Sequence, residues 1–366
     1  IPKGMCLGAC VVAVTKELLK LDAPEDTCVH YCVYHSRYPL AIRHHIESKL
    51  DRILKRKDPD AIWQQPEIKE KLEAHENNNH IFVVMASPVA EVGRNHDYDW
   101  AIVEPSSMRS VIQLAGRVLR HRAHVPQCPN VGLLNQNYRS LINKPICFKR
   151  PGFEYENNGP RMKKEKQKLD EILEAQSYES IDASPRIIKP VYNAKATEFD
   201  NLVHLEHRAL CYSLFEKLND KPKAANVWWK SSPHWCGEVQ RQQRFRASPS
   251  DEAYYLIVEN KYRPIKWLWR NESISPPKFG EGDVQIVDGS DRMCEFGMGS
   301  HFWFSLCAKE IYMRLAEEIK DADSDDLSQF SKRYGEVRLI DYQNGSVQEY
   351  EYHPELGVYK AIGEWE

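Results

Sequence analysis

The sequence predicts an α/β fold built on a mostly parallel sheet with helices on both faces. Two observations support this prediction. Short continuous apolar runs occupy residues 28–36, 81–87 and 99–105, and segments with helical spacing alternate with them. Runs that are apolar at every position are typical of parallel strands covered on two sides. The chain has 366 residues, 42% of them hydrophobic, which is enough for about two domains.

The individual elements follow from local patterns. Residues 5–21 have the apolar spacing of an amphipathic helix, which we expect to end before Pro24. Ser106 or Ser107 is a suitable N-cap for a later helix. The expected elements, in order, are a helix at 5–21, a strand at 28–36, a charged helix at 39–57, strands at 81–87 and 99–105, and helices at 106–122 and 201–218.

The composition changes after Gly152 and suggests where the domains end. A polar turn and a charged run precede a serine-rich stretch, which predicts a linker with one exposed helix at 154–185. We therefore expect a first domain at 1–153 and a smaller mixed α+β domain at 186–366. The second domain holds seven of the nine tryptophans and many turn-forming segments.

The composition also excludes some classes of protein. A net charge of −3 excludes a bulk polycation. No apolar run approaches the roughly 18 residues of a membrane-spanning helix, and no secretory leader is visible, so we expect a cytoplasmic protein that does not bind membranes. We expect Ile1 to be an internal position of a longer protein.

The ten cysteines favour reduced, buried thiols. The pairs Cys6 with Cys10 and Cys28 with Cys32 have a wider spacing than the C-x-x-C pairs of zinc ribbons. The sequence therefore gives no reason to assign a metal to them.

The small net charge conceals a cationic block. No acidic residue lies between Glu104 and Glu154, whereas residues 315–366 carry 13 acidic against five basic side chains. Scattered arginines often only solvate helix faces, but so long an acid-free segment favours a surface that binds phosphate groups. The basic residues of the block are Arg109, Arg117, Arg120, Arg122, Arg139, Lys144, Lys149 and Arg150.

Three polar motifs each follow an apolar run, in the region where open α/β sheets bind ligands. Their sequences are Tyr34-His-Ser-Arg37, Ser87-Pro-Val-Ala-Glu-Val-Gly-Arg-Asn-His-Asp-Tyr-Asp99 and Gln113-Leu-Ala-Gly-Arg-Val-Leu-Arg120. We expect Arg117 and Arg120 to lie on one helix face, where both guanidinium groups can reach the same phosphoryl oxygens.

The order and spacing of these motifs resemble motifs IV, V and VI of superfamily-two helicases. More narrowly, the chain resembles the CRISPR-associated helicase-nuclease of type I systems, through the E-x-G element and the run from Ile102 to Arg122. The segments at 148–154, 204–210 and 240–246 are similar to the type I-F branch, in which the adaptation nuclease is fused upstream.

The resemblance implies a fold and a role for each motif. It implies that residues 1–153 form the second RecA-like lobe. Arg117 and Arg120 match arginines that reach the γ-phosphate of ATP, and Gln113 matches the glutamine that couples nucleotide to motion. Gly93 and Asn95 match a Gly-x-Asp element of the family, in which the aspartate contacts the ribose of the nucleotide. Asn95 differs from the family pattern at this aspartate, and Pro88 differs from it where a glutamine is usual. Ser36, Arg37 and Ser87 match positions that hold phosphates of single-stranded DNA.

Several motifs of such an enzyme are absent or only mimicked. The sequence holds no G-x-x-x-x-G-K-[ST] loop. Asp251-Glu252 and His96-Asp97 mimic a D-E-x-x box and an HD nuclease pair, but neither stands in the right context. The resemblance therefore implies a fragment that is inactive alone, within an ATP-dependent DNA helicase and nuclease. ATP with Mg²⁺ would be held mainly by the missing first lobe, and a divalent metal by the missing nuclease domain.

The resemblance also implies partners, and two alternatives remain open. The implied partners are single-stranded DNA, a Cascade-type surveillance complex, the adaptation integrase and phage anti-CRISPR inhibitors. The chain could instead belong to a superfamily-two translocase of another system, or be a binding module that docks a surveillance complex or an inhibitor. Tryptophans such as Trp228, Trp229 and Trp235 are either platforms for unpaired bases or core residues.

Overall fold

A computed structural model describes most of the chain, and its contacts form two compact units. Unit 1 comprises residues 1–95 together with 249–366, and unit 2 comprises residues 96–248. This grouping differs from the predicted division at 153 and 186. Of the described residues, no helix combines the length and the apolar character that crossing a bilayer requires. The described residues are 7–75, 79–91, 95–122, 126–149, 153–154, 161–163, 165–188, 197, 199–215, 251–282, 284–293, 295–319, 326–340 and 348–360.

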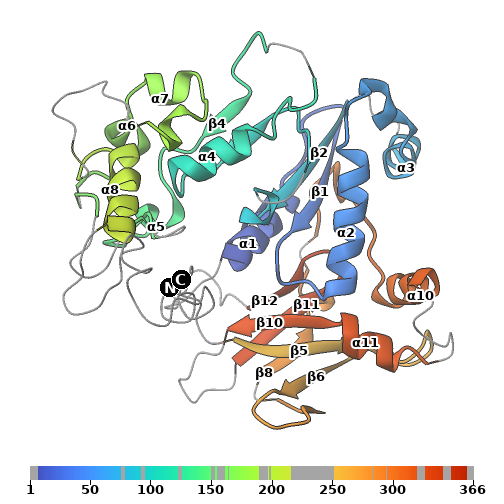
Figure 1. Cartoon of the computed structure of the whole chain (residues 1–366). Coiled ribbons are helices and arrows are strands. Elements are labelled where there is room, and N and C mark those ends of the chain that lie inside the picture. The colour runs from blue at the N-terminus through green and yellow to red at the C-terminus, as the bar shows by residue number, and fades with distance from the viewer. Residues whose placement is uncertain are drawn as a thin grey trace. The chain divides into compact units, whose positions relative to one another are not determined.

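A parallel sheet of three strands organises the first half of unit 1. Two of these strands lie side by side in Figure 1. The central strand β1 (Thr27–Tyr34) pairs in parallel with β2 (Asn79–Ala86) on one side and with β9 (Ser300–Phe302) on the other. The predicted strands at 28–36 and 81–87 are thereby confirmed. The third strand comes from the end of the chain, which explains why residues 249–366 belong to unit 1.

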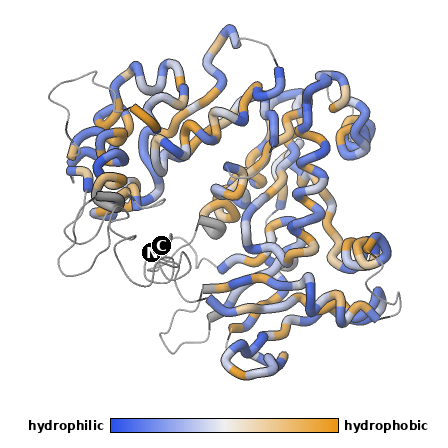
Figure 2. Tube along the Cα trace, viewed as in Figure 1, coloured by the Kyte–Doolittle hydropathy of each residue, from blue (hydrophilic) through white to orange (hydrophobic). Residues whose placement is uncertain are grey.

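Helices pack on both faces of this sheet, and every residue of β1 is buried. Val29 and Val33 face α1 (Leu7–Leu19), in clusters with Leu19 and Val12. The opposite face packs against α2 (Leu40–Ile53), where the Tyr34 hydroxyl donates to Glu47 at 2.8 Å. Hydrophobic and hydrophilic positions alternate along α2 in Figure 2. The helices η1 (Pro59–Gln64), α3 (Pro66–Ala74) and η2 (Pro88–Ala90) complete this region.

The rest of unit 1 contains two further sheets. A sheet in the order β10-β5-β6-β7 is antiparallel throughout, and a sheet in the order β12-β11-β8 has one antiparallel and one parallel pairing. The strands are β5 (Asp251–Ile257), β6 (Lys266–Asn271), β7 (Lys278–Gly280), β8 (Val284–Asp288), β10 (Glu336–Ile340), β11 (Gln348–His353) and β12 (Gly357–Lys360), and the helices are η5 (Ser290–Arg292), α10 (Ala308–Ile319) and α11 (Ser328–Tyr334).

Unit 2 is a small α/β assembly with its own core. Strand β3 (Ala101–Val103) pairs in parallel with β4 (Val131–Leu133), and among the described residues it does not join the sheet of β1 and β2. The helices are α4 (Met108–Ala115), α5 (Tyr138–Leu141), α6 (Leu169–Ile172), α7 (Gln176–Glu179), η3 (Ser184–Arg186) and α8 (Leu202–Phe215). The structure is thus a mixed α/β fold with parallel sheets.

Some described residues of the predicted linker at 154–185 belong to the core of unit 2. Leu169, Ile172 and Leu173 are buried in one cluster with Val111 and Leu205. These apolar residues interrupt the charged run that suggested a solvated helix. Their buried side chains pack α6 into one cluster with α4 and α8.

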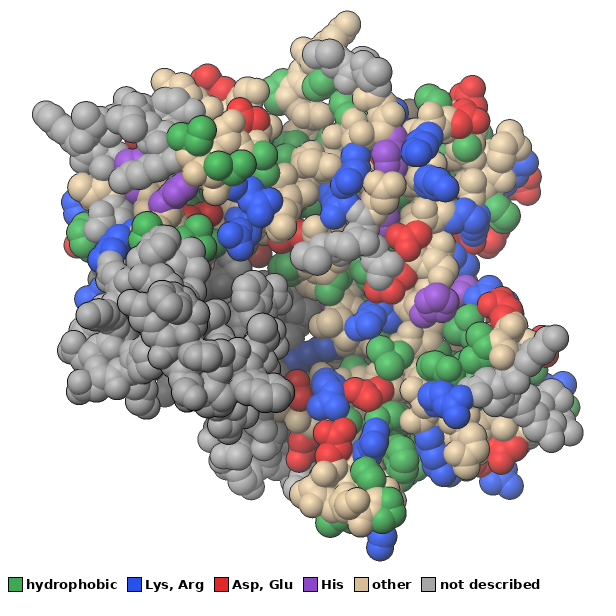
Figure 3. Space-filling model, in the orientation of Figure 1, with side chains coloured by type: hydrophobic (Ala, Val, Ile, Leu, Met, Phe, Trp, Pro, Cys, Tyr) green, Lys and Arg blue, Asp and Glu red, His purple; other side chains and the backbone are tan. Residues whose placement is uncertain are grey.

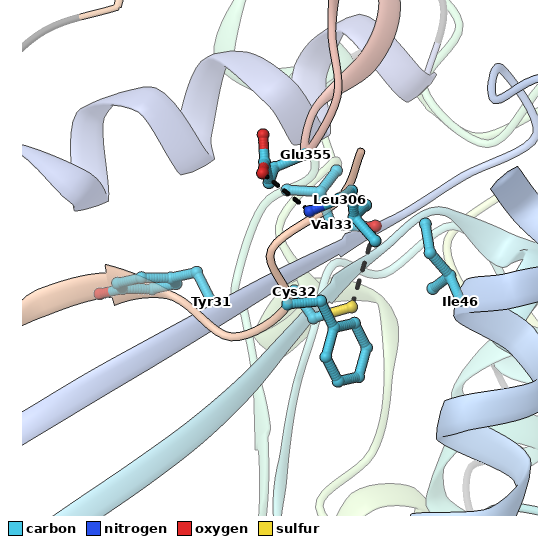
Figure 4. Close-up of a pocket in the computed structure, with 7 residues that line it drawn as sticks. Tyr31, Cys32, Val33, Ile46, Leu306 and Glu355 are labelled. Carbon is cyan, nitrogen blue, oxygen red and sulfur yellow. Dashed lines mark hydrogen bonds between the residues drawn. The ribbon is translucent and has the colours of Figure 1, made fainter. Parts of the chain in front are cut away.

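A small void lies under β1, as Figure 4 shows. It is lined by residues of β1, Ile46 of α2 and the segment that precedes α10, where the Leu306 amide donates to Glu355 at 3.0 Å. Its volume of about 10 Å³ is close to what one water molecule needs. The void is therefore too small to bind a ligand.

Candidate functional site

The first and second motifs meet at the carboxyl edge of the parallel sheet in unit 1. The register pairs Tyr34 with Ala86, the last residues of β1 and β2, and the Ser87 amide donates to the Tyr34 carbonyl at 3.1 Å. The segments that carry Ser36 and Ser87 therefore leave the sheet side by side. Ser36 is exposed, whereas Ser87 is 9% exposed. This edge is the usual ligand-binding edge of a parallel sheet.

Arg37 lies beside Ser36 but is largely buried. Its guanidinium lies 5.5 Å from the ring centre of Tyr350 in β11, and its carbonyl accepts a hydrogen bond from the Val358 amide at 2.8 Å. The Arg37 amide donates to His35 Nδ1 at 3.0 Å. The motif therefore anchors the hairpin of β11 and β12 against the end of β1.

The remainder of the second motif is described only in part. Ser87 precedes η2, which begins at Pro88, and Asn95 is exposed. Gly93 lies outside the described residues, as do residues 240–246 and Trp228, Trp229 and Trp235.

The third motif begins in α4 of unit 2 and continues beyond it. The Ser107 side chain accepts from the Ser110 amide at 3.0 Å, which confirms the predicted N-cap. The helix ends at Ala115 with Gly116 as its C-cap, not at residue 122. The prediction that Arg117 and Arg120 share one helix face is therefore wrong, because both follow the end of the helix.

The backbone after α4 is tied to the segment that precedes β3. The Tyr98 amide donates to the Arg117 carbonyl at 2.8 Å, and the Leu119 amide donates to the Tyr98 carbonyl at 2.9 Å. Leu119 adopts a positive φ of 51°, which turns the chain sharply. We call residues 116–122 the arginine loop, since it carries Arg117, Arg120 and Arg122.

The two predicted finger arginines have different environments within this loop. Arg117 is 8% exposed, whereas Arg120 is exposed and Gln113 is half-buried. Burial lowers the pKa of the Arg117 guanidinium, and the positive charge of Arg120 lowers it further. The two charges are therefore close enough to repel each other, and a shared anionic ligand would relieve that repulsion.

Asp97 holds the arginine loop in place, a role that the sequence did not reveal. Its side chain is fully buried and accepts hydrogen bonds from the amides of Arg120 at 3.1 Å and His121 at 3.0 Å. The Arg122 guanidinium binds the same carboxylate through Nη2 at 2.7 Å and Nε at 3.2 Å. The available signal was an aspartate a few residues before a long acid-free block.

Two further buried glutamates support unit 2, and both lie in segments that suggested the family. Glu206 of α8 accepts hydrogen bonds from the first amides of α4, at Met108 and at Arg109, the latter at 3.3 Å. Burial raises the pKa of Glu206 to about 7, although these bonds lower it. Glu154 accepts from the amides of Cys147 and Phe148, both at 2.7 Å.

The two mimicked motifs have structural contacts. Asp251 begins β5 and pairs with Arg338 of the adjacent strand β10 at 3.2 Å, and Glu252 accepts from the Tyr254 hydroxyl at 3.1 Å. His96 Nδ1 lies 3.0 Å from the Tyr98 hydroxyl.

The predicted site residues thus fall into two groups. Ser36, Arg37 and Ser87 gather at the carboxyl edge of the sheet in unit 1, and Asn95 ends the first of the two segments of that unit. Arg117 and Arg120 lie together in the arginine loop of unit 2, which follows the helix that carries Gln113.

The chain is similar to known proteins of one kind. Residues 9–123 match the family described as CRISPR-associated nuclease/helicase Cas3, C-terminal. The chain is 41% identical over 96% of its length to the CRISPR-associated nuclease/helicase Cas3 subtype I-F/YPEST of Pectobacterium atrosepticum, and 38% identical over 96% to the protein of that name from Pseudomonas aeruginosa. It spans 31% of the length of each. A crystal structure of T. fusca Cas3 matches 38% of this chain and 16% of its own, with 19% identity and a TM-score of 0.27.

Proposed function

We propose, from its kinship with the Cas3 subtype I-F/YPEST nuclease/helicases, that the chain is the C-terminal part of an ATP-dependent DNA helicase and nuclease of CRISPR defence. The whole protein would move along one strand of DNA and degrade it. This chain would supply arginine side chains to the nucleotide and part of the surface that holds the strand.

The arginine loop is the observation that supports this proposal most. Asp97 and the end of α4 fix the backbone around Arg117 and Arg120, while the Arg120 side chain stays exposed. Two guanidinium groups carried on a fixed backbone suit a triphosphate, because negative charge builds up on the phosphoryl oxygens during hydrolysis. Gln113, in the last turn of α4, would link the nucleotide to movement of the unit.

The residues present fit only part of an ATP site. The cationic loop suits the phosphates, but the sequence has no glycine-rich phosphate loop with its lysine, so the other contacts must come from outside this chain. In our proposal a first RecA-like lobe binds ATP and Mg²⁺, this chain contains the second RecA-like lobe, and Gly93 and Asn95 approach the ribose. ATP supplies the phosphoryl group that is cleaved.

The carboxyl edge of the sheet is the proposed contact with single-stranded DNA. Ser36 is exposed there and can donate its hydroxyl to a phosphate, with Ser87 beside it. Because the Arg37 guanidinium lies over Tyr350, we assign Arg37 to supporting the segment that carries Ser36. Contacts of this kind grip the strand without reading its sequence.

The remaining parts of the proposal concern the whole protein. Its nuclease centre would use a divalent metal held outside this chain, and it would act in the cytoplasm on DNA opened by a Cascade-type surveillance complex. The adaptation integrase and anti-CRISPR inhibitors are further proposed partners.

Replacement of Arg117 in the full-length protein tests the proposal. Arg117→Ala should lower DNA-stimulated ATP hydrolysis about 10³-fold, the lower end of what an arginine finger contributes. Arg263→Ala is a matched control, because Arg263 is exposed and pairs only at the surface with Glu259. It should retain the wild-type rate. Near wild-type hydrolysis by a well-folded Arg117→Ala protein would show that Arg117 is not a finger.

A further inference from the structure

A cluster of histidines and one cysteine lies on one face of the parallel sheet in unit 1. Cys28 and His30 are two residues apart on β1, so their side chains point to the same face of the sheet. The register places His80 of β2 opposite Cys28 and His301 of β9 opposite His30. His75 follows the end of α3 and stacks on His301, with ring centres 4.2 Å apart. Five side chains that bind transition metals therefore converge from four separate segments.

This cluster is separate from the proposed DNA and nucleotide contacts. Cys28 lies near the amino end of β1, whereas Ser36 follows its carboxyl end. The arginine loop belongs to unit 2. The cluster therefore needs an explanation of its own.

The geometry of three members suits a metal ion. Ligand atoms of Cys28, His75 and His301 all lie within 4.8 Å of one another. A tetrahedral zinc ion bound at about 2.0–2.3 Å brings its ligand atoms to within roughly 3.5 Å of each other. Side-chain rotations that move the ligand atoms by about 1 Å would therefore bring them to these distances. Cys28 is buried, whereas His75 and His301 are half-buried, which leaves a path for an ion from solvent.

The fourth histidine of the cluster is buried with part of its ring unsatisfied. His30 is fully buried and its Nε2 lies 3.0 Å from His80 Nδ1. Its Nδ1 is buried and has no hydrogen-bond partner among the described residues. A buried nitrogen of this kind is costly unless it accepts a proton or binds a ligand.

We propose that Cys28, His75 and His301 form a binding site for a divalent transition metal, with zinc the best match. Two nitrogens and one sulfur are typical ligands of zinc. On binding, the Cys28 thiol releases its proton to solvent and the thiolate sulfur binds the ion. The metal would tie β9, from the end of the chain, to β1 and to the end of α3. Histidine side chains are visible at the surface over β2 in Figure 3.

Metal titration of the tag-free 366-residue chain, stripped of metal by a chelator, tests this site. We expect one equivalent of Zn²⁺ to bind, with release of a proton and a rise in melting temperature. Co²⁺ used as the probe should give the strong charge-transfer absorption of a cobalt–thiolate bond.

Two buried cysteines of the same strand provide a matched pair of variants. Cys28→Ser should abolish the cobalt–thiolate absorption and weaken Zn²⁺ binding at least 10-fold. Cys32→Ser, four residues further along β1 on the same face, should retain both. His301→Ala should weaken binding in the same way, and His44→Ala, at an exposed position of α2, should not. Absence of stoichiometric binding by the folded chain, or equal absorption in both cysteine variants, would overturn the proposal.

Discussion

Replacement of Asp97 by asparagine is the sharpest test of how the arginine loop is held. The variant keeps the shape of the side chain but removes the negative charge that the Arg122 guanidinium binds through two nitrogens. One amide oxygen of asparagine can still accept a hydrogen bond, but its NH₂ group would face the donors of Arg120, His121 or Arg122. The loop would then lose its anchor.

The magnitude follows from burial. The Asp97 side chain is 0% exposed and that of Arg122 is 14% exposed, so the substitution leaves a largely buried cation without its main counter-charge. Removal of one partner from such a pair lowers the free energy of unfolding by about 3–5 kcal/mol. Because Asp99 also binds Arg122, at 2.6 Å, we expect the lower end, about 3 kcal/mol, in the free energy of unfolding.

Urea denaturation of the 366-residue chain, followed by circular dichroism, measures this change. Asp99→Asn is the matched control, because Asp99 binds the same guanidinium but is 59% exposed, and surface pairs contribute about 1 kcal/mol or less. Equal losses for the two variants, or a loss below about 1 kcal/mol for Asp97→Asn, would refute the view that a buried carboxylate holds the loop. In the full-length protein, Asp97→Asn should also slow ATP hydrolysis while leaving the ATPase residues intact.

Three other predictions concern different parts of the chain. Burial raises the pKa of Glu206 from 4.5 to about 7, so the folded chain holds this proton more tightly than the unfolded chain. The contribution of Glu206 to the free energy of unfolding is therefore largest below pH 4.5 and declines by about 3 kcal/mol as the pH rises through 7. Glu206→Gln should remove that part of the pH dependence of urea unfolding. Gly357 has a φ of +72°, and a Cβ there would lie 2.9 Å from the Arg37 carbonyl oxygen. Gly357→Ala should therefore lower the free energy of unfolding by about 1–3 kcal/mol in the same urea assay. Gly280→Ala is the control, because a Cβ at that position meets nothing within 4 Å. The isolated chain should show no DNA-stimulated ATP hydrolysis in a phosphate-release assay, and measurable turnover would contradict the proposed division of the ATP site.

Local pattern was enough to predict the main elements of the described chain. The apolar run at 28–36 and the helical spacing at 39–57 correspond to β1 and α2, and Ser107 is the N-cap that its position suggested. These features depend on neighbours in sequence, where periodicity and capping are informative. The similarity to Cas3 was likewise visible in short motifs.

Long-range pairing was not predictable in the same way. Strand β9 has only three residues, and nothing in its composition indicates that it pairs with β1. The early end of α4 depends on Gly116 and on bonds between the arginine loop and Tyr98, which precedes β3 in the chain and forms a β-bridge with Val118. The histidine cluster shows the same limit, because its members are scattered along the sequence and meet only through strand register.

The acid-free block acquires a physical explanation once the buried carboxylates are placed around it. Asp97 precedes the block, Glu154 ends it and Glu206 reaches it from α8, and each accepts backbone amides of the block itself. Each is at most 8% exposed, while Arg120 and Lys149 are exposed. The acidic side chains that hold this part of unit 2 together therefore lie inside it, and the exposed side chains of Arg120 and Lys149 are positive. We infer that the block combines a rigid interior with an outer surface suited to phosphate groups, and that substitution of its buried acids would disturb phosphate binding indirectly, through the position of the arginines.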